Sequence, residues 1–247
     1  MIIADMAVLG ETAVAAVAAV FRPKQFRFGD SALAFQRAAF EGLPVTIGIG
    51  LLLGVILAFQ CAAALQQFGV EVYVADMLAI GLFRELGPLV TAIILAGRSG
   101  SAFAAEIGTM KVNEELDALT TMGLPPVRFL VLPRLVAAVV AMPALTIFME
   151  LAALLGGAAV LGLMNVPAPV FWQHVTSITT VFMIVFGLGK SMLFGLLVGL
   201  IGCAAGMTTG ATADGVGTAA TSAVVRGIVA IAVTDGVLAY VCYLWGL

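Results

Sequence analysis

The sequence predicts an all-α integral membrane protein with five transmembrane helices. N-terminal amphipathic helices would lie in the membrane interface, and a short polar helix would connect the second and third spans. Composition is the first observation, because 62% of the 247 residues are hydrophobic and only 10% are charged, with a mean hydropathy of +1.17. Soluble domains carry about 25% charged residues. The second observation is that the apolar runs are long and unbroken rather than alternating, which favours helices over a membrane β-barrel.

The N-terminal region, residues 1–42, is expected to form interfacial helices, followed by a five-helix domain over residues 43–247. Residues 1–21 are about one bilayer long, but two acidic residues interrupt them. An interfacial helix is therefore favoured there, with a span as the alternative. Asp30 can cap a second helix whose apolar side chains share one face, as in helices of the headgroup layer. These side chains are Phe28, Ala32, Phe35, Ala39 and Leu43.

Five apolar runs are long enough to cross a hydrocarbon core of ~30 Å, which takes about 20 helical residues. They cover about 43–65, 86–108, 127–163, 175–207 and 223–245. The segment that precedes the second run is too polar to continue a span and too apolar for an ordinary loop, so we expect a half-buried turn or a broken helix. Loops are predicted at 164–174 and 208–222.

Basic residues favour one orientation in the membrane. With five spans and a cytoplasmic N-terminus, eight Arg and Lys residues fall on the cytoplasmic side and only Arg84 on the outer side. Positively charged loops stay in the cytoplasm, so the C-terminus is expected outside. Small residues at every fourth position predict close helix packing, either within the bundle or between subunits. They are Gly97, Ser101 and Ala105 in the second span and Gly187, Ser191, Gly195, Gly199 and Cys203 in the fourth.

The polar segment 113–123 is predicted to be a short cytoplasmic helix. Asn113 can cap it, and its first turn holds acidic residues that suit the positive end of the helix dipole: Glu114, Glu115 and Asp117. Leu116, Leu119 and Met122 give it an apolar edge, and Gly123 ends it. Such a helix suits docking into a groove of a soluble protein, and a capped surface loop is the alternative.

Charged residues inside the spans need a physical reason, since each costs about 2.5–3.5 kcal/mol to insert. Arg98 and Glu106 lie within the second span, where they can pair with other helices or serve transport directly. Lys190 lies in the middle of the fourth span and needs a partner or a water-filled cavity. Arg84 and Glu85 lie at the outer end of the second span, where a solvated helix end is the simpler interpretation.

Several function classes are disfavoured. The net charge of −3 provides no basic surface for nucleic acid. The string GLGKS resembles a phosphate-binding loop, but Ile184 replaces the required first glycine and the string lies in an apolar span. His174 is the only histidine, with no partner at metal-ligand spacing. We therefore expect no catalytic residue, no metal site and no cofactor in this chain.

Six blocks of the sequence closely resemble the MlaE/YrbE family of ABC-transporter permeases, which are lipid-transport membrane subunits paired with MCE proteins. The blocks are RELGP (84–88), AGRSGSAFAAEIGTMKVNEELDALTTMG (96–123), PxxxLVLPR (126–134), GLGKSMLFG (187–195), GCAAG (202–206) and GVGTAATSAVV (215–225). They occur in order over about 84–235, and the N-terminal part matches more loosely.

The resemblance implies a permease homodimer in the bacterial inner membrane with two copies of a cytoplasmic ABC ATPase, which would bind the ATP and Mg. Residues 113–123 would be the coupling helix, and a periplasmic MCE protein would exchange phospholipid with the permease. The positions that match a lipid pathway are Leu57, Ala64, Leu65, Phe68, Arg84, Glu85 and Lys190. Met183 departs from the family, because relatives can carry an acid there as a partner for the lysine. No STAS-like domain is appended, so any such subunit would be a separate chain.

Two other functions fit the sequence less well. A stand-alone secondary transporter or channel would use the intramembrane charges as a relay, although such transporters often show inverted repeats and none is found here. A structural membrane scaffold would bind no lipid. Transport direction and the lipid species stay open, with sterols, phospholipids and hydrophobic pollutants all compatible.

Overall fold

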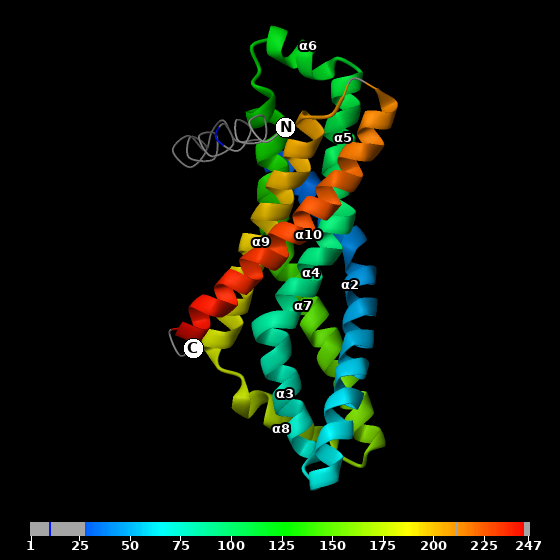
Figure 1. The fold of residues 1–247 in the computed structure, drawn as a ribbon, viewed down its shortest axis with the longest axis vertical. Coiled ribbons are helices and arrows are strands. Elements are labelled where there is room, and N and C mark those ends of the chain that lie inside the picture. Colours follow the sequence, from blue (N-terminus) through cyan, green and yellow to red (C-terminus); the bar gives the residue numbers. More distant parts are fainter. Residues whose placement is uncertain (1–9, 11–27, 211, 245–247) are drawn as a thin grey trace.

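The computed structural model describes residue 10, residues 28–210 and residues 212–244. Within this part of the chain, five helical stretches are long and apolar enough to cross a membrane (Figure 1): Ser31–Phe68, Glu71–Val112, Val127–Leu163, Val181–Met207 and Ala213–Leu244. The predicted helical class and the five spans are thereby confirmed. The helix expected at 1–21 lies outside the described residues.

Helix α2 (Phe28–Leu65) combines two elements that the sequence suggested separately. The amphipathic helix and the first span form one helix of 38 residues, and Pro44 lies inside it without ending it. The expected boundary at 42–43 is therefore not a break in the helix. Packing against α7 explains the continuity, because a Cβ on Gly54 would lie 1.8 Å from the Ala153 backbone oxygen. The two helix backbones touch there, so α2 stays packed against α7 beyond the proline.

The second span is longer than the predicted 86–108. It begins with α3 (Val74–Gly81) and continues through π-helical η4 (Leu82–Leu86), α4 (Gly87–Leu95), π-helical η5 (Ala96–Gly100) and α5 (Ser101–Val112). The broken helix expected before it is present as two 3₁₀ turns, Gln66–Phe68 and Glu71–Tyr73. Gly69 between them has φ 71°, a left-handed conformation that glycine adopts without steric cost.

The remaining elements correct both predicted loops. After α6 (Glu115–Thr121), the third span comprises π-helical η6 (Val127–Val131) and α7 (Leu132–Leu163). Helix α8 (Ala168–Ile178) occupies most of the expected 164–174 loop and delays the fourth span to α9 (Val181–Met207). His174 Nδ1 lies 3.1 Å from Asp76 Oδ1 and ties α8 to α3. Helix α10 (Ala213–Leu244) begins within the expected 208–222 loop, although Gly and Thr in that segment are poor helix formers.

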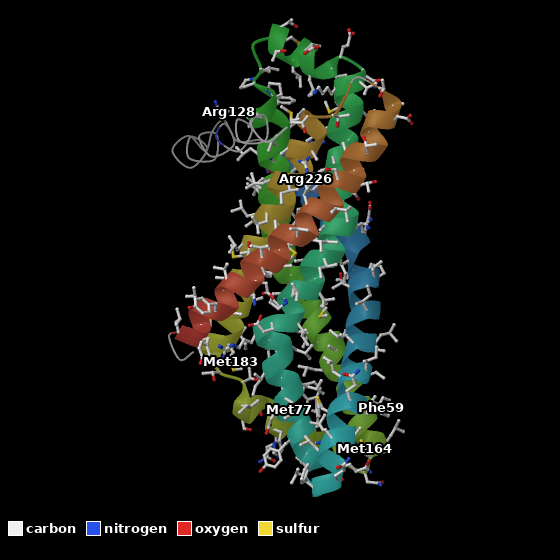
Figure 2. All side chains as sticks on the ribbon, viewed as in Figure 1. Phe59, Met77, Arg128, Met164, Met183 and Arg226 are labelled. Carbon is white, nitrogen blue, oxygen red and sulfur yellow. The ribbon has the colours of Figure 1, made fainter. Side chains whose placement is uncertain are left out.

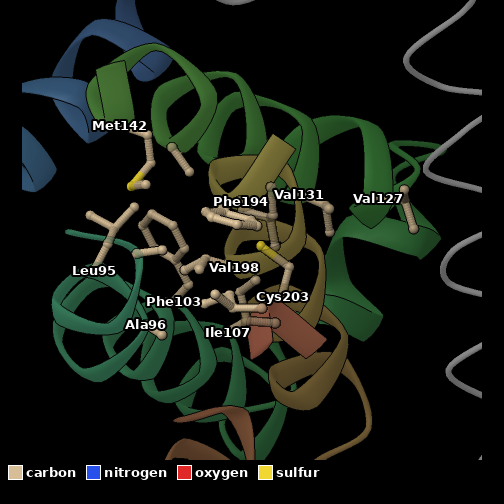
Figure 3. Close-up of a cluster of buried hydrophobic side chains, with 14 of the residues drawn as sticks. Leu95, Ala96, Phe103, Ile107, Val127, Val131, Met142, Phe194, Val198 and Cys203 are labelled. Atoms are coloured by element: carbon tan, nitrogen blue, oxygen red, sulfur yellow. The ribbon is translucent and has the colours of Figure 1, made fainter. Parts of the chain in front are cut away.

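The bundle is elongated, with α6 at one end and α3 and α8 at the other (Figure 1). One apolar cluster, to which α4 to α7, α9 and α10 all contribute, occupies the α6 half (Figure 3). A second cluster joins α2, α3, α7 and α8 in the other half. The small-residue stripe of α9 packs inside the chain, since a Cβ on Gly187 would lie 2.1 Å from the Phe83 oxygen and one on Gly195 2.7 Å from the Ala138 oxygen.

Candidate functional site

A buried lysine in α9 forms the centre of the candidate site. The Lys190 side chain is 1% exposed, and its Nζ donates a short hydrogen bond to Glu85 Oε2 in η4. Nζ also lies 2.5 Å from Asp235 Oδ1 in α10, in an ion pair whose angle does not meet hydrogen-bond geometry. The Arg84 backbone oxygen lies 3.5 Å from Nζ, and the Phe194 ring centroid 5.9 Å. Three helical elements thus converge on one cation.

The charges in this Lys190 cluster explain why the lysine is tolerated. An isolated ammonium in a low-dielectric interior is strongly unfavourable, whereas a paired one with further acceptors is not. One lysine faces two carboxylates, of which Asp235 is 16% exposed and Glu85 34% exposed. The cluster therefore carries excess negative charge, and Glu85 is its most accessible member. Met183 provides no acidic partner for Lys190, but Glu85 of η4 and Asp235 of α10 do.

Two acidic residues in the spans escaped the sequence argument. Asp235 and Glu150 both lie in apolar runs, so the insertion cost that singled out Lys190 applied to them equally. Glu150 in α7 is only 4% exposed. A Cβ on Gly87 would lie 2.5 Å from Glu150 Oε1, so the carboxyl group packs directly against the start of α4.

The structure places the other predicted lipid-pathway residues at the far end of α2, away from α6. Leu57 and Leu65 pack against the second apolar cluster, which also contains Leu82 and Phe83 beside the Arg84–Glu85 pair. Ala64 is exposed, and Phe68 is 76% exposed beyond the helix end. One buried apolar cluster therefore joins the end of α2 to the segment that carries Glu85.

Helix α6 connects the second and third spans, as predicted, but two of its details differ. Leu116 and Leu119 are buried in the chain's own core rather than exposed on a docking edge. Met122 remains 65% exposed. The predicted cap is also wrong, because Glu114 takes the N-cap position with φ 61°, and no side chain caps the helix. Asn113 instead donates to Glu115 Oε1 at 3.4 Å.

The outward face of α6 is consequently acidic. Asn113, Glu114, Glu115, Asp117 and Gly123 are all exposed, and Gly123 ends the segment with φ 74°. The buried leucines fasten this acidic helix to the end of the bundle formed by α5 and η6. A protein that docks on this face would contact its carboxylate groups and the exposed Met122 side chain.

The two charged residues inside the second span, Arg98 and Glu106, are both paired. Arg98 makes a short ion pair with Glu41 of α2. Glu106 accepts hydrogen bonds from Arg134 Nη2 at 2.9 Å and Nε at 3.2 Å, and lies 3.7 Å from Arg37. These pairs join α2, α5 and α7 on the α6 half of the bundle, separate from the Lys190 cluster.

Comparison with known proteins covers most of the chain. The family model described as "Permease MlaE" matches residues 33–241. The chain is 35% identical over 197 residues to a "Probable ABC transporter permease protein" of Rickettsia typhi, covering 79% of this chain and 76% of that protein. A protein of the same description from Synechocystis sp. is 35% identical over 204 residues, covering 82% and 78%.

A plant protein is similar over the same region. The chain is 35% identical over 204 residues to "Protein TRIGALACTOSYLDIACYLGLYCEROL 1, chloroplastic" of Arabidopsis thaliana. The match covers 79% of this chain but only 57% of the plant protein.

Proposed function

The chain belongs to the MlaE permease family, an ABC transporter permease of the membrane, and on this premise we propose that it transports lipid. It moves phospholipid, or a related apolar lipid, between the inner membrane and a periplasmic MCE protein. ATP and Mg are bound and ATP is hydrolysed in a partner ATPase, while this chain supplies the membrane path. The working unit is a homodimer of this chain with two ATPase copies, and it can include a STAS-domain subunit.

The anchored acidic helix α6 is the observation that carries the proposal. A coupling element must be accessible to the partner on one side and fixed to the transport core on the other. Glu115 and Asp117 are exposed, while Leu116 and Leu119 are buried among residues of the main apolar cluster. Movement of a protein docked on α6 is therefore transmitted directly to the helices that pack around those leucines.

The distribution of basic residues supports a cytoplasmic α6. Arg128 and Arg226 both lie in the α6 half of the bundle (Figure 2), as do the pocket-lining residues Arg37, Arg98 and Arg134. Basic residues concentrate on the cytoplasmic side of membrane proteins. The N-terminus is then cytoplasmic and the C-terminus periplasmic, so that α3 and α8 lie on the side of the MCE partner.

The lipid assignment is supported by the apolar residues at the end of α2 and by the Lys190 cluster, whose Glu85 lies in a segment that packs on the same apolar cluster. Exposing acyl chains to water costs about 0.8 kcal/mol per CH₂ group, so a sheltered path from bilayer to partner is needed. Leu57, Ala64, Leu65 and Phe68 provide apolar surface, and Arg84, Glu85 and Lys190 provide polar groups suited to a headgroup. The Arabidopsis relative bears the name of a glycolipid, which agrees with a lipid substrate.

Affinity purification of the full chain from membranes tests the coupling. Glu115→Lys combined with Met122→Ala should abolish co-purification of the ATPase, because both changes lie on the exposed face of α6. Asp214→Lys is the matched control, since it reverses an exposed acid at the start of α10 without touching α6. A permease that moves lipid between vesicles without any ATPase would overturn the proposal.

A stand-alone secondary transporter is the second candidate, favoured by the buried Lys190 cluster, because such charges also form proton relays. Transport by the purified chain that follows a pH gradient and ignores ATP would select it. Mass spectrometry of the purified chain separates both candidates from a scaffold, which would carry no lipid.

A further inference from the structure

A pocket of ≈ 260 Å³ opens between α2, α5 and α7 in the α6 half of the bundle. Its charged lining consists of Arg37, Glu41, Arg98, Glu106 and Arg134. The apolar lining includes Leu33, Ala38, Phe103 and Leu130. The volume is several times that of one water molecule in the liquid, about 30 Å³, so the pocket can hold a polar group with part of an attached chain. The Lys190 cluster has no residue in it.

The charges in this pocket are not balanced. Three guanidinium groups face two carboxylates, which leaves one net positive charge. Arg134 is committed, since it donates to Glu106 and also, at 3.0 Å, to the Leu130 oxygen. Arg37 and Arg98 are more accessible, with side chains 60% and 34% exposed. The pocket thus offers accessible guanidinium donors that match the geometry of a phosphate group.

The surroundings of the pocket indicate which phosphate compound it takes. Leu33 on its rim is 51% exposed, and Phe40 on the same helix is 69% exposed. These side chains belong to the part of α2 that passes from amphipathic to apolar sequence, where a membrane helix enters the headgroup layer. A soluble phosphate would gain nothing from this apolar rim, whereas acyl chains of a phospholipid would cover it.

We propose that this pocket binds the phosphate headgroup of a membrane phospholipid from the leaflet on the α6 side. Arg37 and Arg98 contact the phosphate, which displaces Glu41 from Arg98, while Glu106 stays paired with Arg134 and the acyl chains lie along the exposed apolar face of α2. This site is separate from the proposed transport path and does not depend on it. A chain that proved unable to transport lipid could still bind a phospholipid in this pocket.

Photo-crosslinking with peptide mapping tests the proposal, because it identifies the site as well as the ligand. The full chain is purified in maltoside micelles, which contain no phosphate, and is given phosphatidylglycerol with a photoactivatable group near the headgroup. We expect crosslinks on peptides that contain residues 33–41 and 98–106. A photoactivatable diacylglycerol, which lacks the phosphate, should label these peptides at least about fivefold less, the scale of one accessible charge pair.

Two variants that should change the labelling in opposite directions make the test decisive. Arg37→Gln should lower the labelling about fivefold, and Glu41→Gln should raise it by a similar factor because it removes a competing carboxylate. Arg226→Gln is the matched control, since that arginine lines a different pocket against α9, and it should change nothing. If these ion pairs served only to stabilise the fold, Glu41→Gln would not increase labelling by the phospholipid probe.

Two results would overturn the proposal. Equal labelling by diacylglycerol would show that the pocket does not recognise phosphate. Displacement of the phospholipid label by an excess of inorganic phosphate, with no effect of the acyl chains on affinity, would assign the pocket to free phosphate instead. If Arg37→Gln fails to fold, Glu41→Gln remains as a test. Glu41 is 59% exposed, and its replacement leaves Arg134 paired with Glu106.

Discussion

Replacing Lys190 by methionine should destabilise the protein more than any other single change at the candidate site. The substitution removes the cation that contacts both Glu85 and Asp235, in a site where the lysine itself is 1% exposed. Breaking a buried ion pair by removing one partner costs about 3–5 kcal/mol. Glu85 is 34% exposed and can turn toward water, so the lower half of that range is expected.

Thermal unfolding of the purified chain in detergent measures this effect. For a chain of this length, 1 kcal/mol corresponds to roughly 2–4 °C, so Lys190→Met should lower the melting temperature by about 6–15 °C. Asp235→Asn should cost only about 1 kcal/mol, because Lys190 keeps Glu85 as its partner. The double variant should be more stable than Lys190→Met alone, since a single carboxylate then remains.

Lys111→Met is the matched control for the loss of a lysine. Its Nζ donates to the neutral Met207 oxygen at 2.8 Å, so its removal strands no charge and should cost about 1 kcal/mol. The reasoning fails if Lys190→Met melts within 2 °C of the unmodified chain. It also fails if adding Asp235→Asn to Lys190→Met lowers the melting temperature further, because the stranded acids would then not be the cause.

Three further substitutions test the packing and the backbone through the same melting temperature. Gly187→Leu should prevent folding, because its Cβ alone would lie 2.1 Å from a backbone oxygen of η4. Gly189→Leu is the control and should be tolerated, because a Cβ there would have nothing within 4 Å. Equal melting temperatures of the two variants would contradict the η4–α9 contact. Leu119→Ala should cost about 2–5 kcal/mol as a buried truncation, and exposed Met122→Ala close to none; a neutral Leu119→Ala would mean that α6 is not anchored. Glu114→Gly should stabilise by about 1 kcal/mol, since φ 61° strains a residue with a Cβ, and a loss of stability would show that its side chain has another role.

Hydropathy was sufficient to predict the fold class and the five spans, because the bilayer sets a length that each apolar run must meet. The ends of elements were harder to predict. Helix α8 and the first turns of α10 contain Gly, Thr and Pro residues that read locally as loops. Contacts such as the one between His174 and Asp76 make the helical state favourable there, and tertiary packing of this kind leaves no local mark in the sequence.

The small-residue stripe of the second span shows a different limit. Gly97, Ser101 and Ala105 share a face only in a regular α-helix, but residues 96–100 form a π turn with more residues per turn. The side chains after it are rotated, so Gly97 is exposed with nothing within 4 Å and Gly100 makes the close contact with α9 instead. The fourth span is a regular helix, and there the same spacing argument correctly predicted close packing.

The site itself was predicted in part. Lys190 and the acidic segment stood out by residue type alone, because a charge in an apolar run requires an explanation wherever it occurs, whereas Glu85 was assigned to the site only through the family resemblance. The identity of each partner was not predictable, since Lys190, Glu85 and Asp235 come from three elements whose neighbourhood only the fold defines. The buried orientation of Leu116 was missed for the same reason, because a seven-residue helix has too few turns to show which face is covered.

The two π segments of the second span explain how one helix serves two charged sites. Arg84 and Glu85 lie in η4 and Arg98 lies in η5, with the nine residues of α4 between them. A π turn adds a residue to the helix and so redirects every side chain that follows it, which a uniform α-helix cannot do. Through η4 the span presents Glu85 and the Arg84 carbonyl to Lys190, and after α4 it presents Arg98 to the opposite neighbour, α2. Because α4 is a continuous helix of nine residues with a rise of about 1.5 Å per residue, it holds the two π segments about 14 Å apart along one rigid element. A displacement of α5 by a protein docked on α6 would therefore reach the pocket beside α2 first and the Lys190 cluster second.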